Sequence, residues 1–282
     1  MNEIKRLTDK EVKTLLSKDL KSFADFCDLN GLRYFLGGGT LLGAIRHQGF
    51  IPWDDDVDVL MPRPDYDAFL KLTALNPIRE NLIVQAPDRN DDYLWPFAKI
   101  INTDTVLIEL QYMKKYRDLQ RQWGGLYIDV FPIDGVPDSK KEQKDLFKKI
   151  KFYTKGLQRS TYRIDGVRPL IRYLFRLSIL PVYRIIGFKW FLKKLEKLVK
   201  QYNYKEQRFV AACFGSYGIK EVVNRKCFST AIKVIFEGHE YNAPIGYEEY
   251  LSSIYGNYMQ LPPEDKRVSH HKREVFWSRN SK

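Results

Sequence analysis

The chain has 282 residues, of which 44% are apolar and 14% aromatic, and 47 Lys and Arg against 35 Asp and Glu give a formal net charge of +12. This composition excludes a disordered chain and is sufficient for a large folded core. The three cysteines, Cys27, Cys213 and Cys227, are far apart in the sequence. Their spacing excludes a disulfide framework and a zinc finger and favours a reducing compartment.

The N-terminal segment is expected to form a helix and not a signal peptide, because charges interrupt it throughout. Apolar residues recur at helical spacing over residues 8–30, and Thr8 followed by Glu11 has the pattern of a capping box. The most apolar segment, Pro169–Phe188, is interrupted by three arginines and by Pro181, so it falls short of the roughly 20 largely uncharged residues of a membrane span. We therefore expect a cytoplasmic protein that does not cross the membrane.

The next elements are predicted as strand, glycine turn and helix. A short strand is predicted at residues 32–36. The next four residues are Gly37-Gly38-Gly39-Thr40, and helical character resumes over residues 41–46. Backbone N–H groups at a glycine turn that opens a helix can receive a phosphate group. A second strand is predicted at residues 57–61 and a second helix at residues 64–75.

The middle and the end of the chain read as short strands around a basic helical block. Strands are predicted at residues 83–86, 97–101, 106–110 and 126–131, separated by turn-forming residues. Another strand at residues 231–236 and a helix at residues 247–255 follow the block. These patterns predict an α+β fold with a core at residues 1–139, a helical insertion at residues 140–205 and a C-terminal part at residues 206–282 that completes the core.

The basic block carries most of the positive charge of the chain. Lys140–Lys200 contains 18 Lys and Arg against 4 Asp and Glu, a balance of +14. Arg168, Arg172 and Arg176 would form one stripe on a helix, with Leu174, Phe175 and Ile179 as apolar residues for an interface. The alternatives are a solvated surface, an anionic membrane surface and nucleic acid. No nucleic-acid-binding module accompanies the block, so we expect membrane contact and no nucleic acid.

The segment 53–59 contains the strongest signal for chemistry, with aspartates at positions 54, 55, 56 and 58. In an extended segment, Asp54, Asp56 and Asp58 would point to one face. Like charges on one face call for a divalent cation, and Mg²⁺ bound by carboxylates also takes phosphate oxygens as ligands. Mg²⁺ is the expected ion, with Mn²⁺ as the alternative. The combination of a glycine turn and an Asp-x-Asp pair 16 to 18 residues after Thr40 is more specific than either motif alone.

These motifs resemble the LicD family of phosphocholine transferases, which is related to fukutin and fukutin-related protein. The resemblance is most specific in the first block, which holds both the glycine turn and the aspartates. It extends over segments near both ends of the chain: residues 36–47, 49–58, 97–100 with Thr105, 127–135 and 250–263.

The resemblance implies a nucleotidyltransferase-like core in which a small mixed sheet, flanked by helices, carries an aspartate pair and a third carboxylate. Asp56 and Asp58 match the pair as metal-binding catalytic residues. Asp129 is the predicted third ligand, because a charge in an apolar strand is costly unless it is paired or coordinated. Asp134 is the alternative, although Pro132 and Gly135 favour a turn there.

The family also implies a CDP-linked donor, CDP-choline being the expected one, and transfer of its phospho-substituent to a hydroxyl group of a glycan. The acceptor would be teichoic acid, lipopolysaccharide or a lipid-linked precursor, with the enzyme peripheral at the inner face of the cell membrane. Further candidate contacts to the donor fall into two sets. Those expected near its phosphates are Gly38, Gly39, Thr40, Arg46, His47 and Lys99, and those expected around a quaternary ammonium are Trp53, Tyr255 and Tyr258.

Three interpretations remain open from the sequence. His270 and His271 either approach the donor or lie in a solvated tail, and the tail is favoured. The same carboxylates would also serve a nucleotidyltransferase that acts on a sugar or a small molecule. The non-enzymatic alternative is a basic protein that binds membranes or nucleic acid and has a structural acidic motif.

Overall fold

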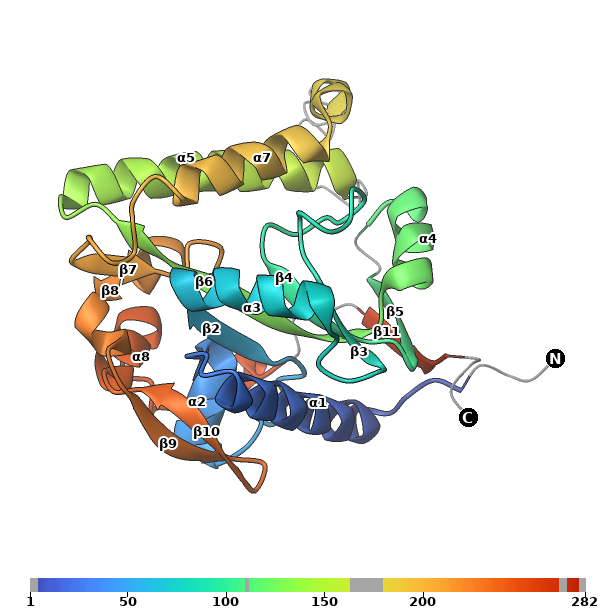
Figure 1. Cartoon of the computed structure of the whole chain (residues 1–282), viewed down its shortest axis with the longest axis horizontal. Helices are drawn as coiled ribbons and strands as arrows, with labels where there is room; N and C mark the ends of the chain where they lie inside the picture. The colour runs from blue at the N-terminus through green and yellow to red at the C-terminus, as the bar shows by residue number, and fades with distance from the viewer. Residues whose placement is uncertain (1–4, 110–111, 163–179, 269–272, 279–282) are drawn as a thin grey trace.

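The computed structural model describes residues 5–109, 112–162, 180–268 and 273–278 (Figure 1). The helices are α1 (Asp9–Leu29), α2 (Gly38–His47), α3 (Arg63–Leu75), α4 (Lys114–Trp123), α5 (Lys140–Thr161), α7 (Phe188–Val199) and α8 (Tyr247–Tyr255), with short 3₁₀ helices η1 (Gly218–Glu221), η2 (Arg225–Phe228) and η3 (Glu264–Lys266). The strands are β1 (Phe35–Leu36), β2 (Asp58–Pro62), β3 (Leu82–Gln85), β4 (Ala98–Asn102), β5 (Thr105–Glu109), β6 (Leu126–Val136), β7 (Phe209–Ala211), β8 (Val223–Asn224), β9 (Ala231–Phe236), β10 (His239–Pro244) and β11 (Arg273–Trp277).

A mixed sheet forms the centre of the molecule and confirms the α+β prediction. Five of its strands lie in the order β1-β2-β6-β4-β3, and β7 and β8 continue from the far end of β6. The pair β2–β6 is parallel, whereas the other pairs are antiparallel. Helices α1 and α3 cross in front of this sheet in Figure 1. The pairs β9–β10 and β5–β11 form two separate small sheets.

The N-terminal helix begins as the sequence predicts. Oγ1 of Thr8 accepts a hydrogen bond from the backbone N–H of Glu11 at 3.3 Å, and Oε2 of Glu11 accepts from the backbone N–H of Thr8 at 2.8 Å. These reciprocal bonds satisfy N–H groups that the first turn of a helix leaves without partners.

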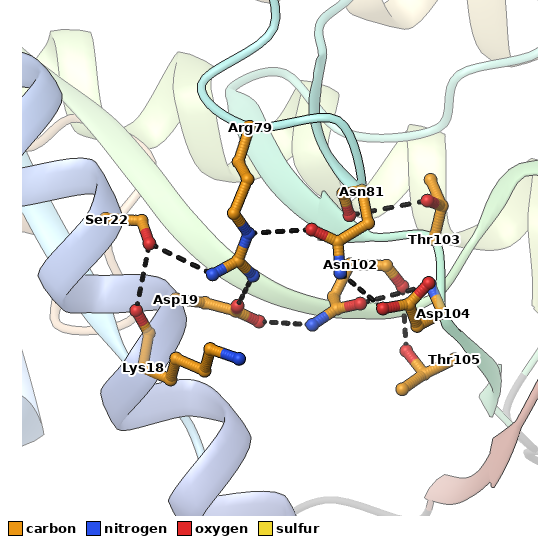
Figure 2. A network of polar contacts seen from close by, with 9 residues as sticks. All are labelled: Lys18, Asp19, Ser22, Arg79, Asn81, Asn102, Thr103, Asp104 and Thr105. Atoms are coloured by element: carbon orange, nitrogen blue, oxygen red, sulfur yellow. Dashed lines mark hydrogen bonds and ion pairs between the residues drawn. The ribbon is translucent and has the colours of Figure 1, made fainter. Parts of the chain in front are cut away.

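A buried polar network fixes α1 against the sheet (Figure 2). The carboxylate of Asp19 on α1 accepts from Nη2 of Arg79 and from Nδ2 of Asn102 on β4, both at 2.8 Å. Nε of Arg79 donates to Oδ1 of Asn81 at 2.7 Å, which links the network to the turn before β3. Because side chains alternate along a strand, Asn102 faces α1 whereas Lys99 faces the opposite side of the sheet.

Strand β6 is longer than predicted, and Asp134 lies in it and not in a turn. Residues 126–130 pair with β4 and residues 134–136 pair with β7, so Pro132 falls in the gap between these two partners. A proline is tolerated there because no residue of β4 or β7 is paired with it, so its missing N–H removes no hydrogen bond to those strands. The local turn signal of Pro132 and Gly135 is therefore overridden by pairing with distant strands.

Several elements were not predicted. Helix α4 is rich in Lys, Arg and Gln and has only three apolar residues, although Tyr116, Leu119 and Trp123 are at helical spacing. Strand β11 pairs with β5, and Arg6 forms a bridge to Phe276, so the described ends of the chain lie side by side (Figure 1). Such pairings join segments that are far apart in the sequence, where local patterns carry little information. Strand β1 is also shorter than expected, at two residues.

Helices α5 and α7 form an antiparallel pair with its own apolar cluster (Figure 1). A Cβ atom at Gly156 would lie 2.2 Å from the ring of Phe191, so this glycine allows the two helices to approach closely. The cluster continues onto Val136 of β6 and Ala211 of β7. The boundaries at residues 140 and 205 remain predictions.

Two predictions about the basic block and the C-terminus concern residues outside the described ranges. These residues are Arg168, Arg172, Arg176, Leu174, Phe175 and Ile179 in the block, and His270 and His271 near the C-terminus. Within the described residues, no helix combines the length and the apolar character that a bilayer span needs.

Candidate active site

Three charged side chains form a row across neighbouring strands of the main sheet. Lys99 on β4 is in register with Asp129 on β6, and Asp129 is in register with Asp58 on β2. Residues in register on adjacent strands point to the same face, which here is the face opposite α1. The structure therefore brings together two of the three predicted ligands, Asp58 and Asp129, from positions 71 residues apart in the sequence.

The acidic loop before β2 places three more carboxylates beside this row. Ligand oxygens of Asp54, Asp55 and Asp56 lie within 4.8 Å of one another. The predicted alternation of Asp54, Asp56 and Asp58 along an extended strand is wrong, because the strand begins only at Asp58 and the preceding residues form a loop. The loop is held to the sheet by a hydrogen bond of 3.0 Å from the N–H of Asp129 to the carbonyl of Val57.

The glycine turn brings the start of α2 against the aspartates. A Cβ atom at Gly39 would lie 2.5 Å from Oδ2 of Asp54, and one at Gly38 would lie 3.1 Å from Oδ2 of Asp58. Gly38 also has a φ of +46°, which disfavours any residue with a side chain. Glycine at both positions lets the N-terminal end of a helix, with its positive partial charge, approach the carboxylates.

Thr40 holds Asp58 in place. Its Oγ1 accepts a hydrogen bond of 2.9 Å from the backbone N–H of Asp58, and the carbonyl of Asp58 accepts one of 3.0 Å from the N–H of Gly37. Thr40 is buried. This bond fixes the backbone of the aspartate, so Thr40 acts as a positioning residue, and its contact with the donor stays a prediction.

Burial and mutual repulsion raise the pKa of two carboxyls in the row. For Asp58, burial raises the pKa well above its ordinary value, and the charges of Asp56, Asp129 and Asp54 add to this. For Asp129, burial raises the pKa, whereas the ammonium group of Lys99 opposes the rise. A set of hard oxygen donors that repel one another suits a divalent cation such as Mg²⁺ or Mn²⁺, which would relieve the repulsion.

Lys99 is buried and is the direct partner of Asp129. Its ammonium group forms an ion pair with Oδ1 of Asp129 and lies 3.3 Å from the ring centroid of Tyr127 and 4.7 Å from that of Trp95. The aromatic faces compensate part of the cost of burying the charge. Lys99 is therefore a counter-ion to the third carboxylate, and a direct contact to the donor phosphates stays a prediction.

Asp134 has a different environment from Asp129. Its carboxylate accepts from Nε and Nη2 of Arg63 at 2.6 and 2.8 Å, and its side chain is 2% exposed against 15% for that of Asp129. It lies five residues further along β6, on the face that carries Arg63. Because this carboxylate is nearly fully buried and is paired with Arg63, Asp129 is favoured as the third member of the site.

A cavity of about 540 Å³ opens beside the acidic loop. Its lining joins Gly39 and Asp54 to four aromatic side chains that come from three regions of the chain: Trp53, Tyr217, Tyr255 and Tyr258. The hydroxyl groups of Tyr217 and Tyr255 are 3.0 Å apart. The aromatic residues predicted for a quaternary ammonium thus line one cavity, together with Tyr217, which the sequence analysis missed.

Arg46 and His47 are adjacent at the end of α2 but have different surroundings. Arg46 lines the cavity, and its Nη1 donates to the carbonyl of Tyr258 at 2.9 Å. Its Nε donates to Nε2 of His47 at 2.9 Å. Burial lowers the pKa of His47, and the charge of Arg46 lowers it further. His47 is not among the described residues that line this cavity, so its contact with the donor stays a prediction.

Arg273 on β11 is a candidate that the sequence analysis missed. Its side chain is 4% exposed, its Nη2 donates to the carbonyl of Asp55, and its Nε lies 3.5 Å from Oδ2 of Asp55. Among the described residues, Nη1 of Arg273 has no hydrogen-bond acceptor. A buried guanidinium with a spare donor next to the acidic loop could bind a phosphate oxygen. Only the pairing of β11 with β5 brings it there.

Glu221 supports the segment that carries Tyr217, and it predicts a pH dependence. Its carboxylate accepts from the hydroxyl of Tyr250 at 3.0 Å, and burial raises its pKa from 4.5 to about 7. The folded state therefore binds the proton of Glu221 more tightly than the unfolded state does. This contribution to stability is complete below pH 4.5 and is lost as the pH rises to about 7.

We expect Glu221→Gln to remove this part of the pH dependence. Its free energy of unfolding should exceed that of the wild type by up to about 3 kcal/mol at pH 8 and should match it near pH 4. Urea unfolding at several pH values measures this difference. Tyr250→Phe is the matched control, because the loss of the hydroxyl should move the transition to higher pH and not abolish it. A wild-type slope that persists in Glu221→Gln would contradict the assignment.

Comparison with known proteins agrees with the geometry of the site. Residues 31–184 match the family described as LicD/FKTN/FKRP, nucleotidyltransferase domain. The chain is 31% identical to the lipopolysaccharide cholinephosphotransferase LicD of Haemophilus influenzae over 97% of this chain and 99% of that protein. A segment of 29 residues, 10% of this chain, is 66% identical to 6% of the human ribitol 5-phosphate transferase FKRP. An uncharacterised protein of Rickettsia typhi is 43% identical over 20% of this chain and 19% of its own length.

Proposed function

The chain belongs to the LicD family and is a LicD-type phosphotransferase, and from this premise we propose that it transfers phosphocholine from CDP-choline to a hydroxyl group of a cell-surface glycan. The non-enzymatic alternative is therefore wrong. The relative from Haemophilus influenzae is named for lipopolysaccharide as its substrate, which supports lipopolysaccharide or its lipid-linked precursor over teichoic acid as the acceptor.

The proposed step is a single displacement at the phosphorus atom that bears choline. The oxygen of the acceptor hydroxyl forms a bond to this phosphorus, and the bond from phosphorus to the bridging oxygen of the diphosphate breaks. CMP leaves with the electron pair, and a carboxylate of the aspartate cluster, which comprises Asp54, Asp55, Asp56, Asp58 and Asp129, accepts the hydroxyl proton. Asp56, Asp58 and Asp129 are the residues proposed to hold a divalent cation. A bound cation would neutralise charge on the transferred phosphoryl group and on the leaving CMP.

The cavity lined by aromatic residues is the observation that supports choline as the head group. Trp53, Tyr217, Tyr255 and Tyr258 can surround a quaternary ammonium, whose attraction to an aromatic face persists without any hydrogen bond. Asp54, in the same lining, adds a negative charge that favours a cationic group. CDP-ribitol and CDP-glycerol carry hydroxyl groups instead, and these would leave the aromatic faces unused.

A donor screen tests the proposal. With Mg²⁺ present, we expect CDP-choline to raise the melting temperature more than CDP-ribitol, CDP-glycerol or CDP-ethanolamine does, because a ligand that binds only the folded state stabilises it. Tyr255→Leu should reduce the shift with CDP-choline to that with CDP-glycerol and leave the shift with CDP unchanged. Equal shifts for all four donors in the wild type would contradict the assignment of choline.

The product of turnover separates the two enzymatic alternatives. Transfer of a phospho-substituent releases CMP, whereas nucleotidyl transfer releases pyrophosphate. We expect one CMP to be released for each CDP-choline consumed. EDTA should abolish this release of CMP, and added Mg²⁺ should restore it. Release of pyrophosphate from a nucleoside triphosphate would favour the nucleotidyltransferase instead.

Gly39→Val tests the approach of α2 to the acidic loop. The added side chain would contact Asp54 and displace either the loop or the start of the helix, so donor affinity should fall by about tenfold or more, equivalent to at least 1.4 kcal/mol. Calorimetry with CDP-choline measures the affinity, and circular dichroism checks that the fold is kept. Normal donor affinity in a folded variant would show that the glycine turn is not part of the donor site.

A further inference from the structure

A second cavity lies between α5 and the segment 213–219. Its volume is about 720 Å³. Its lining includes the apolar side chains of Phe147, Ile150 and Phe214 and residues 215–218. We call this cavity the α5 groove. It is distinct from the cavity beside the acidic loop, with which it shares Tyr217.

One face of α5 lines the groove with four lysines, Lys144, Lys148, Lys151 and Lys155. Their spacing of i, i+4, i+7 and i+11 places them on a single helical face. At 1.5 Å per residue, the row spans roughly 16 Å. No Asp or Glu belongs to the described lining, so the groove has a strong positive potential.

Within the described residues, ion pairs leave most of the positive charge of this row unpaired. Lys148 forms an ion pair of 3.2 Å with Asp145, but both side chains are more than half exposed, and such pairs are weak in water. In the described part of the chain, no ion pair engages Lys144, Lys151 or Lys155. An anionic ligand in the groove would supply the missing counter-charge.

Tyr217 connects the groove to the site of chemistry. It lines both cavities, and its hydroxyl contacts that of Tyr255 in the aromatic cavity. The charges of Asp58 and Asp54 also raise its pKa, after burial and Glu221, so the catalytic carboxylates are close to it. The α5 groove and the aromatic cavity are therefore adjacent, with Tyr217 in the lining of both.

We propose that the α5 groove binds the acceptor, a glycan chain that carries phosphate or other anionic groups, and holds its hydroxyl group at the aspartate cluster. The inference rests on the proposed function, in which the donor occupies the aromatic cavity. The row of lysines is longer than one sugar phosphate, so it fits an acceptor with anionic groups on more than one sugar. The apolar part of the lining accommodates the faces of sugar rings. The lysine side chains are also exposed at the surface, so binding to an anionic membrane is the alternative outcome of the test.

Binding of a model anionic glycan tests this inference without any turnover. The probe is a sulfated tetrasaccharide derived from heparin, with uncharged maltotetraose as its control, and calorimetry gives the affinity. In the groove variant Lys151→Glu/Lys155→Glu, we expect the sulfated tetrasaccharide to bind at least about tenfold more weakly, because two attractive contacts become repulsive. The matched variant Lys141→Glu/Lys149→Glu makes the same charge change on exposed positions of α5 outside the groove, and it should bind within about twofold of the wild type.

Two further measurements make each outcome decisive. CDP-choline should shift the melting temperature equally in the wild type and in both variants, and weaker donor binding in the groove variant would overturn the inference by making the groove a donor site. Equal weakening of the tetrasaccharide in both variants would overturn it in favour of a diffuse basic surface. If the groove variant loses binding to vesicles of phosphatidylglycerol and phosphatidylcholine while its affinity for the tetrasaccharide is unchanged, the lysines bind a membrane and the inference is wrong. Failure of CDP-choline to bind the wild type would refute the proposed donor and leave the result on the groove intact.

Discussion

Asp58→Asn should abolish transfer and leave the fold intact. We expect turnover to fall by at least about 10³-fold, because the variant removes a carboxylate from the set proposed to hold the cation and to accept the proton of the hydroxyl group. The backbone bonds of Asp58 to Thr40 and Gly37 do not involve its side chain, so its position is retained. In EDTA, the free energy of unfolding should rise by about 1–3 kcal/mol, because a buried carboxylate with a raised pKa is replaced by a neutral amide.

Melting temperatures with and without Mg²⁺ separate the metal from the chemistry. Mg²⁺ should stabilise the wild type and should have little effect on Asp58→Asn. Asp138→Asn, which changes an exposed aspartate beyond the end of β6, is the matched control and should behave as the wild type in both assays. Wild-type turnover in Asp58→Asn, or an undiminished Mg²⁺ effect in that variant, would refute the assignment of Asp58 to a metal site.

Asp134→Asn should lower stability and spare turnover, whereas Asp129→Asn should lower turnover, although both aspartates lie on β6. Asp134→Asn should destabilise the protein by about 3–5 kcal/mol, because it leaves the guanidinium of Arg63 without its bidentate partner. Its turnover per folded molecule should stay within about threefold of the wild type, since Asp134 is paired with Arg63 and lies outside the row of Lys99, Asp129 and Asp58. Asp129→Asn should lower turnover by about 10³-fold. Urea unfolding and turnover at a temperature at which both variants are folded give the two quantities.

A double variant distinguishes loss of chemistry from loss of stability at Asp129. Asp129→Asn leaves the buried ammonium group of Lys99 without its carboxylate, which costs stability for a reason unrelated to catalysis. Lys99→Met/Asp129→Asn removes the unpaired charge, so stability should recover while turnover stays low. If turnover recovers with stability, Asp129 has only a structural role. If instead Asp134→Asn abolishes turnover in the folded protein, the third carboxylate is Asp134.

The local features of this protein were readable from its sequence because the interactions that produce them span a few residues. The capping box of Thr8 and Glu11 joins residues three apart, and the structure confirms it. The glycine turn before α2 and the run of aspartates before β2 were recognised from their residue types, since few backbone environments need consecutive glycines or tolerate adjacent carboxylates. Helical and strand periodicity placed most elements of the core, and the α+β class followed from their order.

The composition of the site depended on pairings between distant segments, which only the tertiary structure decided. Asp129 and Asp134 lie on the same strand in different surroundings, because the register of β6 puts one beside Asp58 and the other beside Arg63. Arg273 reaches the acidic loop through the pairing of β11 with β5. Tyr217 joins the two cavities because a loop folds back between α5 and α8. Sheet register and helix packing are set by contacts across the whole core, and no local pattern in the sequence encodes them.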